Sequence, residues 1–372
     1  MSTKILITGG AGFIGSHLAD QLLERGYEVR ALDNLSPQVH GADAQRPDYL
    51  NPEVELQVGD IRRPDAVRKA LRGVDGVFHL AAAVGVGQSM YRIADYTAVN
   101  NLGTAVLMEA LVRRPVARLV TASSMSLYGE GLYRAADGRL ISDARRTRDQ
   151  LAAGQWEPHD TDGQPLQPVP TPESKPPDLA SLYALSKFDQ ERMTLMLAEA
   201  YDMPATALRL FNVYGPRQAL SNPYTGVLAI FASRYLNGQP PVIFEDGAQR
   251  RDFVSVHDVA RAFCLAYEAP AAAGEVFNIG SGRAYRVDEI AAEMAAAVGA
   301  AELAPEITGR YRVGDIRHCF ADIARAHTVL GYQPRIHLED GLRELTAWLP
   351  ETQAIDRVLQ ARHELERRGL TL

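Results

Sequence analysis

Three residues of the chain could together remove a proton from an alcohol. Tyr183 and Lys187 stand four positions apart at the start of a helical run, so they share one helix face, one turn apart. A phenol has an ordinary pKa of roughly 10, and a nearby ammonium favours phenolate and draws that pKa towards neutrality. Ser124, near the end of a strand, could add a hydrogen bond at the reacting hydroxyl. The pattern predicts a tyrosine base.

A Tyr and Lys at this spacing are also a common pair on helix surfaces, so the segment before them matters. An apolar strand, residues 5–8, leads into Gly9, Gly12 and Gly15, and we expect a helix from about Ser16 to Arg25. Gly9 permits a tight turn, Gly12 lets the backbone approach a pyrophosphate, and Gly15 lets helix and strand pack closely. The helix N-terminus adds free N–H groups and the positive end of its dipole. The run predicts a dinucleotide site.

The next strand selects among dinucleotides. Residues 28–32 are expected to form it, and it ends in Asp33, 18 residues after Gly15. A carboxylate there accepts hydrogen bonds from a ribose 2′-OH and repels a 2′-phosphate. The sequence therefore predicts NAD, and a nicotinamide ring is a second positive charge that favours the Tyr183 phenolate.

These groups need a sheet to bring them together. Strand-like runs alternate with helical stretches, at residues 5–8, 28–32, 54–58, 76–80, 118–122 and 205–210. Apolar strands alternating with amphipathic helices predict a doubly wound parallel α/β sheet, a Rossmann fold over residues 1–210. Asp60 and the run His79 to Ala83 follow two of the strands, at the edge where such a sheet places its ligand. Asp60 could hold an adenine amino group there.

The remaining chain differs in pattern. After about Leu210 it loosens into short elements, including 244–247, 251–254 and 277–280, which predicts a smaller α+β lobe over residues 211–350 that binds substrate. Residues 131–178 are rich in Pro, Gly and charge and are expected to be an insertion. Apolar residues spaced among charges predict an amphipathic surface helix over 351–372.

Composition excludes several classes of protein. The 372 residues are 46% hydrophobic and 23% charged with net charge −7, and no basic stretch suggests a nucleic-acid partner. No apolar run is long enough to span a bilayer, and residue 4 already adjoins the first strand, so we expect a cytoplasmic protein with no membrane partner. Cys264 and Cys319 offer neither a disulfide framework nor a metal cluster, and we expect small core fillers.

Ordered motifs over residues 5–325 resemble those of the extended short-chain dehydrogenases/reductases, in the nucleotide-sugar epimerase and dehydratase family. They are Thr8 to Gly15, Asp33, Asp60-Ile61, His79 to Ala82, Asn100 with Gly103-Thr104, Ser123-Ser124 with Tyr128-Gly129, Tyr183 with Lys187, Arg209 with Phe211 to Arg217, Arg251 to Phe253, His257 to Val259, Phe277 to Gly280, and Arg312 with Gly314-Asp315. These motifs are specific for the family and less so for the substrate.

The resemblance implies roles for individual residues. Ser124, Tyr183 and Lys187 would be the catalytic trio. NAD would contact Gly9, Gly12, Phe13, Ile14, Gly15, Asp33, Asn34, Asp60, Ile61, Leu80, Ala81, Ala82, Asn100, Tyr183 and Lys187. The nucleotide sugar would contact Val86, Gln88, Ser89, Ser124, Ser126, Asn212, Arg251 and Arg312. An arginine fork suits phosphate oxygens, although Arg251 and Arg312 taken alone could equally form surface salt bridges.

The residues after Ser124 favour one reaction. Dehydratases of the family carry an Asp-Glu pair there, and its decarboxylases an acid nearby, whereas this chain has Met125 and Ser126, neither a general acid at neutral pH. We expect epimerisation at C4 of a dTDP- or UDP-hexose through a transient 4-keto sugar. The alternatives are a net dehydrogenase or ketoreductase, less favoured a 4,6-dehydratase, and outside enzymes a dinucleotide-binding scaffold, which would not need the trio.

The insertion and the assembly stay more open. Epimerases resembling the dTDP-rhamnose 4-epimerases include long versions of the 131–178 segment, and some carry paired cysteines that look metal-binding. Here His159 and Asp162 stand without cysteine, so we predict no zinc. The segment could cap the sugar or form a subunit contact. The resemblance also implies a homodimer through residues 95–113 and 183–201, which are sufficiently apolar.

Overall fold

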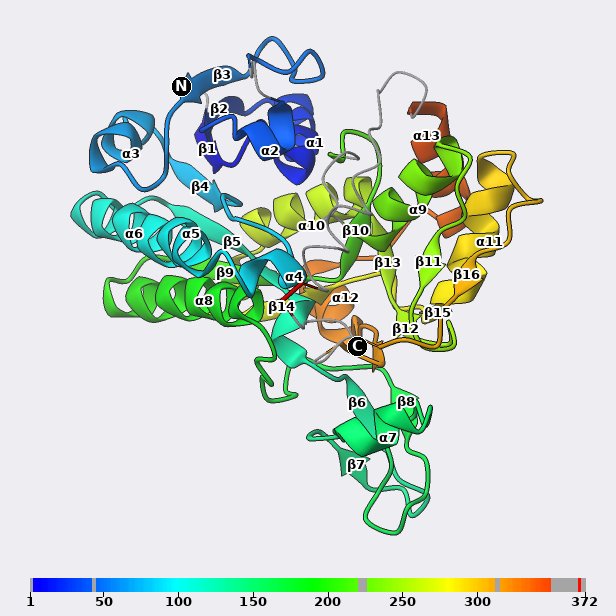
Figure 1. Cartoon of the computed structure of the whole chain (residues 1–372). Helices are drawn as coiled ribbons and strands as arrows, with labels where there is room; N and C mark the ends of the chain where they lie inside the picture. The colour runs from blue at the N-terminus through cyan, green and yellow to red at the C-terminus, as the bar shows by residue number, and fades with distance from the viewer. Residues whose placement is uncertain (1–2, 42–44, 220–225, 312–314, 349–366, 369–372) are drawn as a thin grey trace.

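The computed structural model describes residues 3–41, 45–219, 226–311, 315–348 and 367–368. Within them, seven parallel strands form the central sheet (Figure 1). Across the sheet they run in the order β14 (Val276–Ile279), β9 (Ala205–Leu210), β5 (Arg118–Ser124), β4 (Gly76–His79), β1 (Lys4–Thr8), β2 (Glu28–Asp33) and β3 (Glu55–Val58). The chain order reverses between β1 and β4, where such sheets bind ligands. The predicted doubly wound α/β fold is confirmed.

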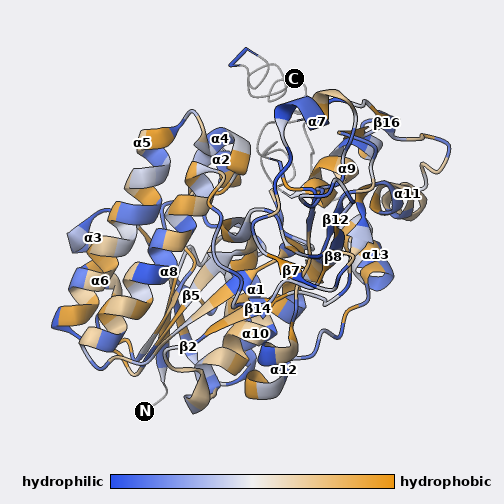
Figure 2. Ribbon diagram, turned by 90° about the horizontal axis from the view of Figure 1, so that it is seen from below, coloured by the Kyte–Doolittle hydropathy of each residue, from blue (hydrophilic) through white to orange (hydrophobic). Residues whose placement is uncertain are grey.

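Two helical layers explain why the central strands are apolar on both faces. In β1, Ile5 and Ile7 pack into one core cluster and Leu6 into another. The first layer holds α1 (Phe13–Glu24), α10 (Val256–Glu268) and α12 (Ala324–Leu330). The second holds α3 (Pro64–Ala70), α6 (Gly103–Arg113) and α8 (Leu182–Ala200). Figure 2 shows the strands between these layers.

Short helical segments occupy the connections. They are α2 (Pro37–His40), α4 (Val86–Ser89), α5 (Ile93–Tyr96), the π-helical η1 (Thr97–Leu102) and the 3₁₀ turns η2 (Met125–Tyr128) and η3 (Pro270–Ala272). η1 continues directly into α6, so the helix expected from residue 95 to 113 has a wide turn in its first half. Such turns often lie at functional sites.

A second core builds the smaller lobe. Its helices are α9 (Val227–Leu236), α11 (Val287–Ala297) and α13 (Leu338–Trp348). Its strands are β10 (Asn212–Tyr214) with β13 (Phe253–Ser255), β11 (Val242–Ile243) with β16 (Glu306–Ile307), and β12 (Arg250–Arg251) between β15 (Tyr285–Arg286) and β17 (His318–Cys319). Apolar faces of the three helices meet in one cluster, as an amphipathic pattern requires.

One segment is not where we expected it. Residues 277–280 were expected in the smaller lobe, but β14 pairs with β9 and completes the central sheet. The helices α10 and α12 likewise pack on that sheet. The reason is that the chain returns from the lobe to the sheet, and a four-residue strand carries no local signal of its distant partner. Residues 211–350 are therefore not all in the lobe.

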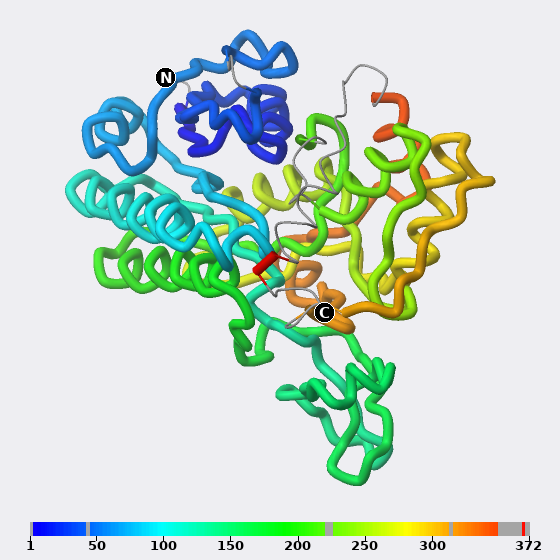
Figure 3. Tube along the Cα trace, in the orientation of Figure 1, coloured from blue at the N-terminus to red at the C-terminus, as the bar shows by residue number. Residues whose placement is uncertain are grey.

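The expected insertion folds as a projecting arm. It leaves the sheet after β5 and returns to α8, as the tube in Figure 3 follows. Strand β6 (Leu132–Arg134) lies between β7 (Leu140–Ile141) and β8 (Gln167–Val169), and α7 (Arg148–Ala152) lies beside them. Tyr133, Ala135, Ala144 and Leu166 form its own small core.

The expected C-terminal helix over 351–372 lies outside the described residues except at 367–368, where the Arg368 guanidinium stands 4.3 Å from the ring centre of Tyr91. Among the helices that the structure describes, none combines the length and the apolar character needed to cross a membrane.

Candidate functional site

The glycine turn has the shape that a pyrophosphate needs. Gly9 has φ +72°, and a Cβ on Gly15 would lie 2.3 Å from the Gly9 carbonyl oxygen, so the turn and the helix contact both depend on glycine. A Cβ on Gly12 would meet only that oxygen, at 3.4 Å. Gly12 therefore faces open space in front of the first amides of α1, at Phe13 and Ile14, which have no intrahelical acceptor.

Asp33 is held at the end of β2, beside this turn. Its Oδ2 accepts from the Ala11 amide at 3.0 Å and its Oδ1 from the Leu35 amide at 2.9 Å. Two backbone donors fix the carboxylate and leave lone pairs for two ribose hydroxyls. The geometry fits the ribose of NAD and repels an added phosphate.

The neighbouring strand ends supply the rest of the expected cofactor surface. Asp60 accepts three hydrogen bonds from Arg62 and one from Asn34, and these bonds, Arg62 first, lower the pKa of its carboxyl. Ile61 is buried against Gly103, where a Cβ would lie 2.6 Å from the isoleucine. The amide of Ala81, between Leu80 and Ala82, donates to Thr8 Oγ1 at 3.2 Å. The adenine contact of Asp60 stays a prediction.

Asn100 connects this edge to the helix that carries Tyr183. Within η1, its Oδ1 accepts from the Ala83 amide at 2.7 Å, and its Nδ2 donates to the Ala83 carbonyl and to Ser186 Oγ at 2.9 Å. Ser186 Oγ in turn donates to the Tyr183 carbonyl. The protein occupies this amide group on both sides, so Asn100 positions the loop after β4 against α8.

Tyr183 begins the helix α8. Ser181 caps the helix by accepting from the Ala184 amide, and the amide of Tyr183 itself donates to Ser89 Oγ at 3.0 Å. Ser89 Oγ donates to the Val86 carbonyl. Ser89, expected at the sugar, is thus used to tie α4 to the first turn of α8.

The hydroxyl of Ser124 has a defined direction. Its oxygen accepts from Ser126 Oγ at 2.9 Å and from the Ser126 amide at 3.2 Å. A hydroxyl has two acceptor lone pairs and one proton, so the Ser124 proton is left for donation to the Tyr183 phenol. That hydrogen bond lowers the pKa of Tyr183, but burial raises it more, and the phenol stays above its ordinary pKa of 10.

Lys187 is directed differently from our expectation. Its ammonium donates to the Ala122 carbonyl at 2.7 Å and to Gln190 Oε1 at 2.6 Å, whereas burial and the Ser124 hydroxyl set the direction of the pKa shift of Tyr183. Burial lowers the pKa of Lys187 to about 7, against the opposing effect of Glu191. Lys187 lies one helical turn after Tyr183, as its spacing predicts. Its ammonium, however, is hydrogen-bonded to the main chain of β5 at Ala122 and to Gln190.

Three buried partners of this network escaped the sequence argument as site residues. Gln190 Nε2 donates to Thr104 Oγ1 at 2.9 Å, and Thr104 Oγ1 lies 2.9 Å from His79 Nε2. Burial and the charge of Lys187 lower the pKa of His79 to about 3, so His79 is neutral. Gln190 stands one turn after Lys187, and that spacing is the signal that could have found it.

The remaining expected substrate residues differ in exposure and in hydrogen bonding. Val86 is exposed, whereas Gln88 is buried and bonded to Gln38 and Tyr96. Asn212 begins β10, and its Oδ1 is buried without a partner among the described residues. This oxygen is placed to accept a hydrogen bond from a bound ligand. Arg251 lies in β12 and donates to three main-chain carbonyls. Arg312 lies outside the described residues.

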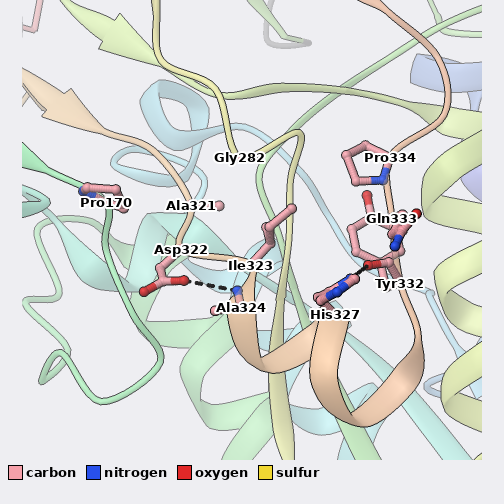
Figure 4. A pocket seen from close by; sticks show the side chains of 10 residues that line it. All are labelled: Pro170, Gly282, Ala321, Asp322, Ile323, Ala324, His327, Tyr332, Gln333 and Pro334. Carbon is pink, nitrogen blue, oxygen red and sulfur yellow. Dashed lines mark hydrogen bonds between the residues drawn. The ribbon is translucent and has the colours of Figure 1, made fainter.

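A surface pocket of about 390 Å³ lies elsewhere. Figure 4 shows it around α12, where Asp322 accepts from the Ala324 amide and His327 lies near Tyr332. None of the expected site residues lines it. In the described part of the chain, no three His, Cys, Asp or Glu side chains are grouped to hold a metal ion. Cys264 and Cys319 are buried and free, as expected of core fillers.

Comparison with known proteins agrees with this geometry. Residues 5–280 match the model of the NAD dependent epimerase/dehydratase family. The dTDP-L-rhamnose 4-epimerase of Burkholderia thailandensis is 37% identical over 358 residues, which cover 95% of this chain and 96% of that protein. The UDP-glucose 4-epimerase of Thermotoga maritima, solved with UDP-glucose, superimposes with a TM-score of 0.77 at 32% identity, covering 94% of this chain and 99% of that one. The Thermus thermophilus UDP-glucose 4-epimerase, solved with NAD, has a TM-score of 0.73 at 30% identity, covering 94% and 100%.

Proposed function

Because the chain belongs to the NAD dependent epimerase/dehydratase family, we propose that it epimerises C4 of a dTDP- or UDP-activated hexose with bound NAD. The observation that carries the proposal is the hydrogen bond from Ser126 to Ser124 beside Tyr183, whose pKa the Ser124 hydroxyl lowers against the larger effect of burial. The Ser124 hydroxyl proton is directed at the phenol. No carboxylate follows Ser124 directly in the chain, where Met125 and Ser126 stand.

The chain's own residues would manage one proton. The turn from Gly9 to Gly15 and Asp33 would hold the dinucleotide, which when bound supplies reversible acceptance of the C4 hydride. Tyr183 Oη would take the proton of the sugar 4-OH, and with substrate bound Ser124 would turn its one proton from the phenol to the oxygen that forms the 4-keto group. Tyr183 would return the proton after the sugar turns and takes the hydride on its other face.

Burial also defines what the substrate complex must supply. The pKa of Tyr183 lies above 10 in this structure because burial outweighs the Ser124 hydrogen bond. A positive nicotinamide ring beside the phenol would favour phenolate. We therefore expect the base to become active only when oxidised cofactor is bound, which couples proton removal to hydride removal.

Dehydration is disfavoured on the same residues. Elimination across C5 and C6 needs an acid near the leaving hydroxyl, and here Met125 is apolar and Ser126 spends its proton on Ser124. The absorbance of reduced nicotinamide distinguishes an epimerase from a net dehydrogenase or ketoreductase. An epimerase converts substrate with no net change in this absorbance.

The test of the proposed function is Tyr183→Phe. We expect the purified variant to retain NAD and to lose at least about a thousandfold in turnover, because it removes the base and no cofactor-binding backbone. A panel of dTDP- and UDP-sugars is used, with the C4 configuration followed by proton NMR. A Tyr183→Phe enzyme that still epimerises at the wild-type rate contradicts the assignment.

A homodimer is part of the same proposal. Apolar side chains stand exposed on the helices expected to meet: Leu102 (53%), Leu185 (41%) and Met196 (55%). Leu185 and Met196 are three turns apart on one face of α8. Exposure of this kind supports an interface between two copies, and light scattering measures the state directly. The expected cytoplasmic location stays a prediction.

A further inference from the structure

A charged cluster, buried at Arg317 and Glu245 and half-exposed at Glu157 and Asp246, joins the arm to the smaller lobe. We call it the junction cluster, and its members are Glu130, Arg146, Glu157, Glu245, Asp246, Arg317 and His318. They come from three separate parts of the chain: residues 130–157 at the base and in the arm, 245–246, and 317–318 beside β12. Buried charges are costly unless each is paired, so we asked what this cluster holds in place.

Arg317 is the centre of the cluster and is 1% exposed. Its Nε and Nη2 donate to Glu157 Oε1 at 3.0 and 2.6 Å. Its Nη1 donates to Glu245 and Asp246, and Nη2 also donates to Asp246. All five guanidinium donors are therefore used. Arg317 has none left for a phosphate, so it acts within the protein.

Glu157 also fixes His318, the residue that follows Arg317. The Arg250 amide donates to His318 Nδ1 at 3.0 Å, so in the neutral ring the proton is on Nε2, and it is donated to Glu157 Oε2 at 2.8 Å. Burial raises the pKa of Glu157, but the bonds from His318 and Arg317 lower it to about 2. One ionised carboxylate from the arm thus holds two consecutive side chains of the lobe.

The backbone held in this way contacts Arg251. Arg251 Nη1 donates to the Arg317 carbonyl at 3.0 Å, and its Nη2 donates to the Ile316 carbonyl. A third bond goes to the Arg250 carbonyl, and the Asp315 carboxylate faces Nη2 at 3.8 Å, so three of the five donors have hydrogen-bond partners among the described residues. From the arm, Arg146 adds a second hold, because its Nη2 donates to the Asp315 carbonyl at 2.8 Å.

We propose that the arm is a positioning element for the nucleotide end of the substrate: Glu157 fixes the backbone of residues 316–318, which orients Arg251 towards the pyrophosphate. This inference rests on the proposed function and on the nucleotide-sugar contact that the family resemblance implies for Arg251. It assigns the insertion a role within the same subunit, as an anchor whose effect reaches the substrate through one guanidinium. Glu157 is a positioning residue, since it acts through Arg317 and His318.

The experiment measures binding of UDP and of dTDP to NAD-loaded protein by calorimetry, beside kcat and KM for the best sugar substrate. Glu157→Ala should weaken nucleoside diphosphate binding about tenfold and raise KM to match, with kcat within about twofold and bound NAD unchanged. Glu157→Gln, which keeps the side chain's shape, should show a smaller change in the same direction and serves if the alanine variant does not fold. Asp137→Ala, which breaks an exposed ion pair with Arg139 in the same arm, should change neither constant.

A double-mutant cycle with Arg251→Ala decides between positioning and general damage. If Glu157 acts through Arg251, then Glu157→Ala weakens binding by less than about twofold once Arg251 is gone. Equal weakening in both backgrounds, or a fall in kcat with KM unchanged, would overturn the proposal. Wild-type protein that binds UDP or dTDP but epimerises no sugar refutes the proposed function, while the cycle still tests the arm. Wild-type protein that binds neither diphosphate overturns the positioning role as well.

Discussion

The glycine turn and the junction cluster both arrange groups expected to meet phosphate, but by opposite means. The turn uses main-chain amides and the absence of side chains, within residues 9–15 of one chain segment. The cluster uses seven charged or titratable side chains brought from residues 130–157, 245–246 and 317–318. The first is a property of local backbone geometry and the second of the folded chain, so substitutions should damage them differently.

The largest effect is expected in the glycine turn. Gly15→Ala places a methyl group 2.3 Å from a carbonyl oxygen, and we expect a loss of about 3 kcal/mol or more in the free energy of unfolding. Gly12→Ala has room for the methyl group, so it should fold with nearly unchanged melting temperature yet purify without NAD. Thermal unfolding and nucleotide release from the denatured protein check both. If Gly12→Ala retained full NAD, the open space in front of Gly12 would not be the pyrophosphate site.

A buried ion pair between α8 and β9 should give an effect of similar size. Glu191 takes bonds from Arg209 at 3.0 and 2.7 Å and from Ser123 at 2.6 Å, with the carboxylate almost fully buried. Glu191→Ala leaves the arginine unpaired and should cost about 3–5 kcal/mol in denaturant unfolding. Glu199→Ala, exposed on the same helix, should change this by less than about 0.5 kcal/mol. Equal values for the two variants would contradict the buried pair's importance.

The smallest effect is expected at the junction cluster, and it depends on pH. The folded pKa of Glu157, about 2, lies below its ordinary value of 4.5, so the ionised form stabilises the fold above pH 4.5 and this contribution is lost as the pH falls towards 2. The melting temperature of Glu157→Gln should therefore lie a few degrees below wild type at pH 6–7, and the gap should narrow below pH 4.5. A gap that is constant from pH 7 to 4 would show that the charge of Glu157 is not responsible. Both proteins are compared by calorimetry in matched salt.

What could be predicted from the sequence follows the same division. The turn after β1, Asp33 and the Tyr183 and Lys187 spacing are local patterns, and the structure places them at one sheet edge. The six predicted strands are present: five are mostly buried, whereas β3 at the sheet edge is exposed or half-buried at every position. Their roles in catalysis and binding stay predictions.

The rest depends on distant partners. The seventh strand, β14, is short and gains its place only by pairing with β9. Lys187 was expected beside the phenol, whereas its ammonium donates to the Ala122 carbonyl of β5 and to Gln190. Glu157 looked like one charge in a loop, and only the fold brings it to Arg317 and His318. Side chains that pair across 160 residues leave no local pattern in the sequence.

The return of the chain to β14 limits how this enzyme can be recombined. A cut at residue 210 would remove the strand that covers β9 and leave its amides and carbonyls unpaired, a surface that invites intermolecular strand pairing. It would also strip α10 and α12 from one layer. Transplanting the smaller lobe onto a relative therefore means exchanging three separate pieces: before α10, between β14 and α12, and after α12. The smaller lobe is one unit in space, but no single pair of cut points in the sequence separates it from the sheet.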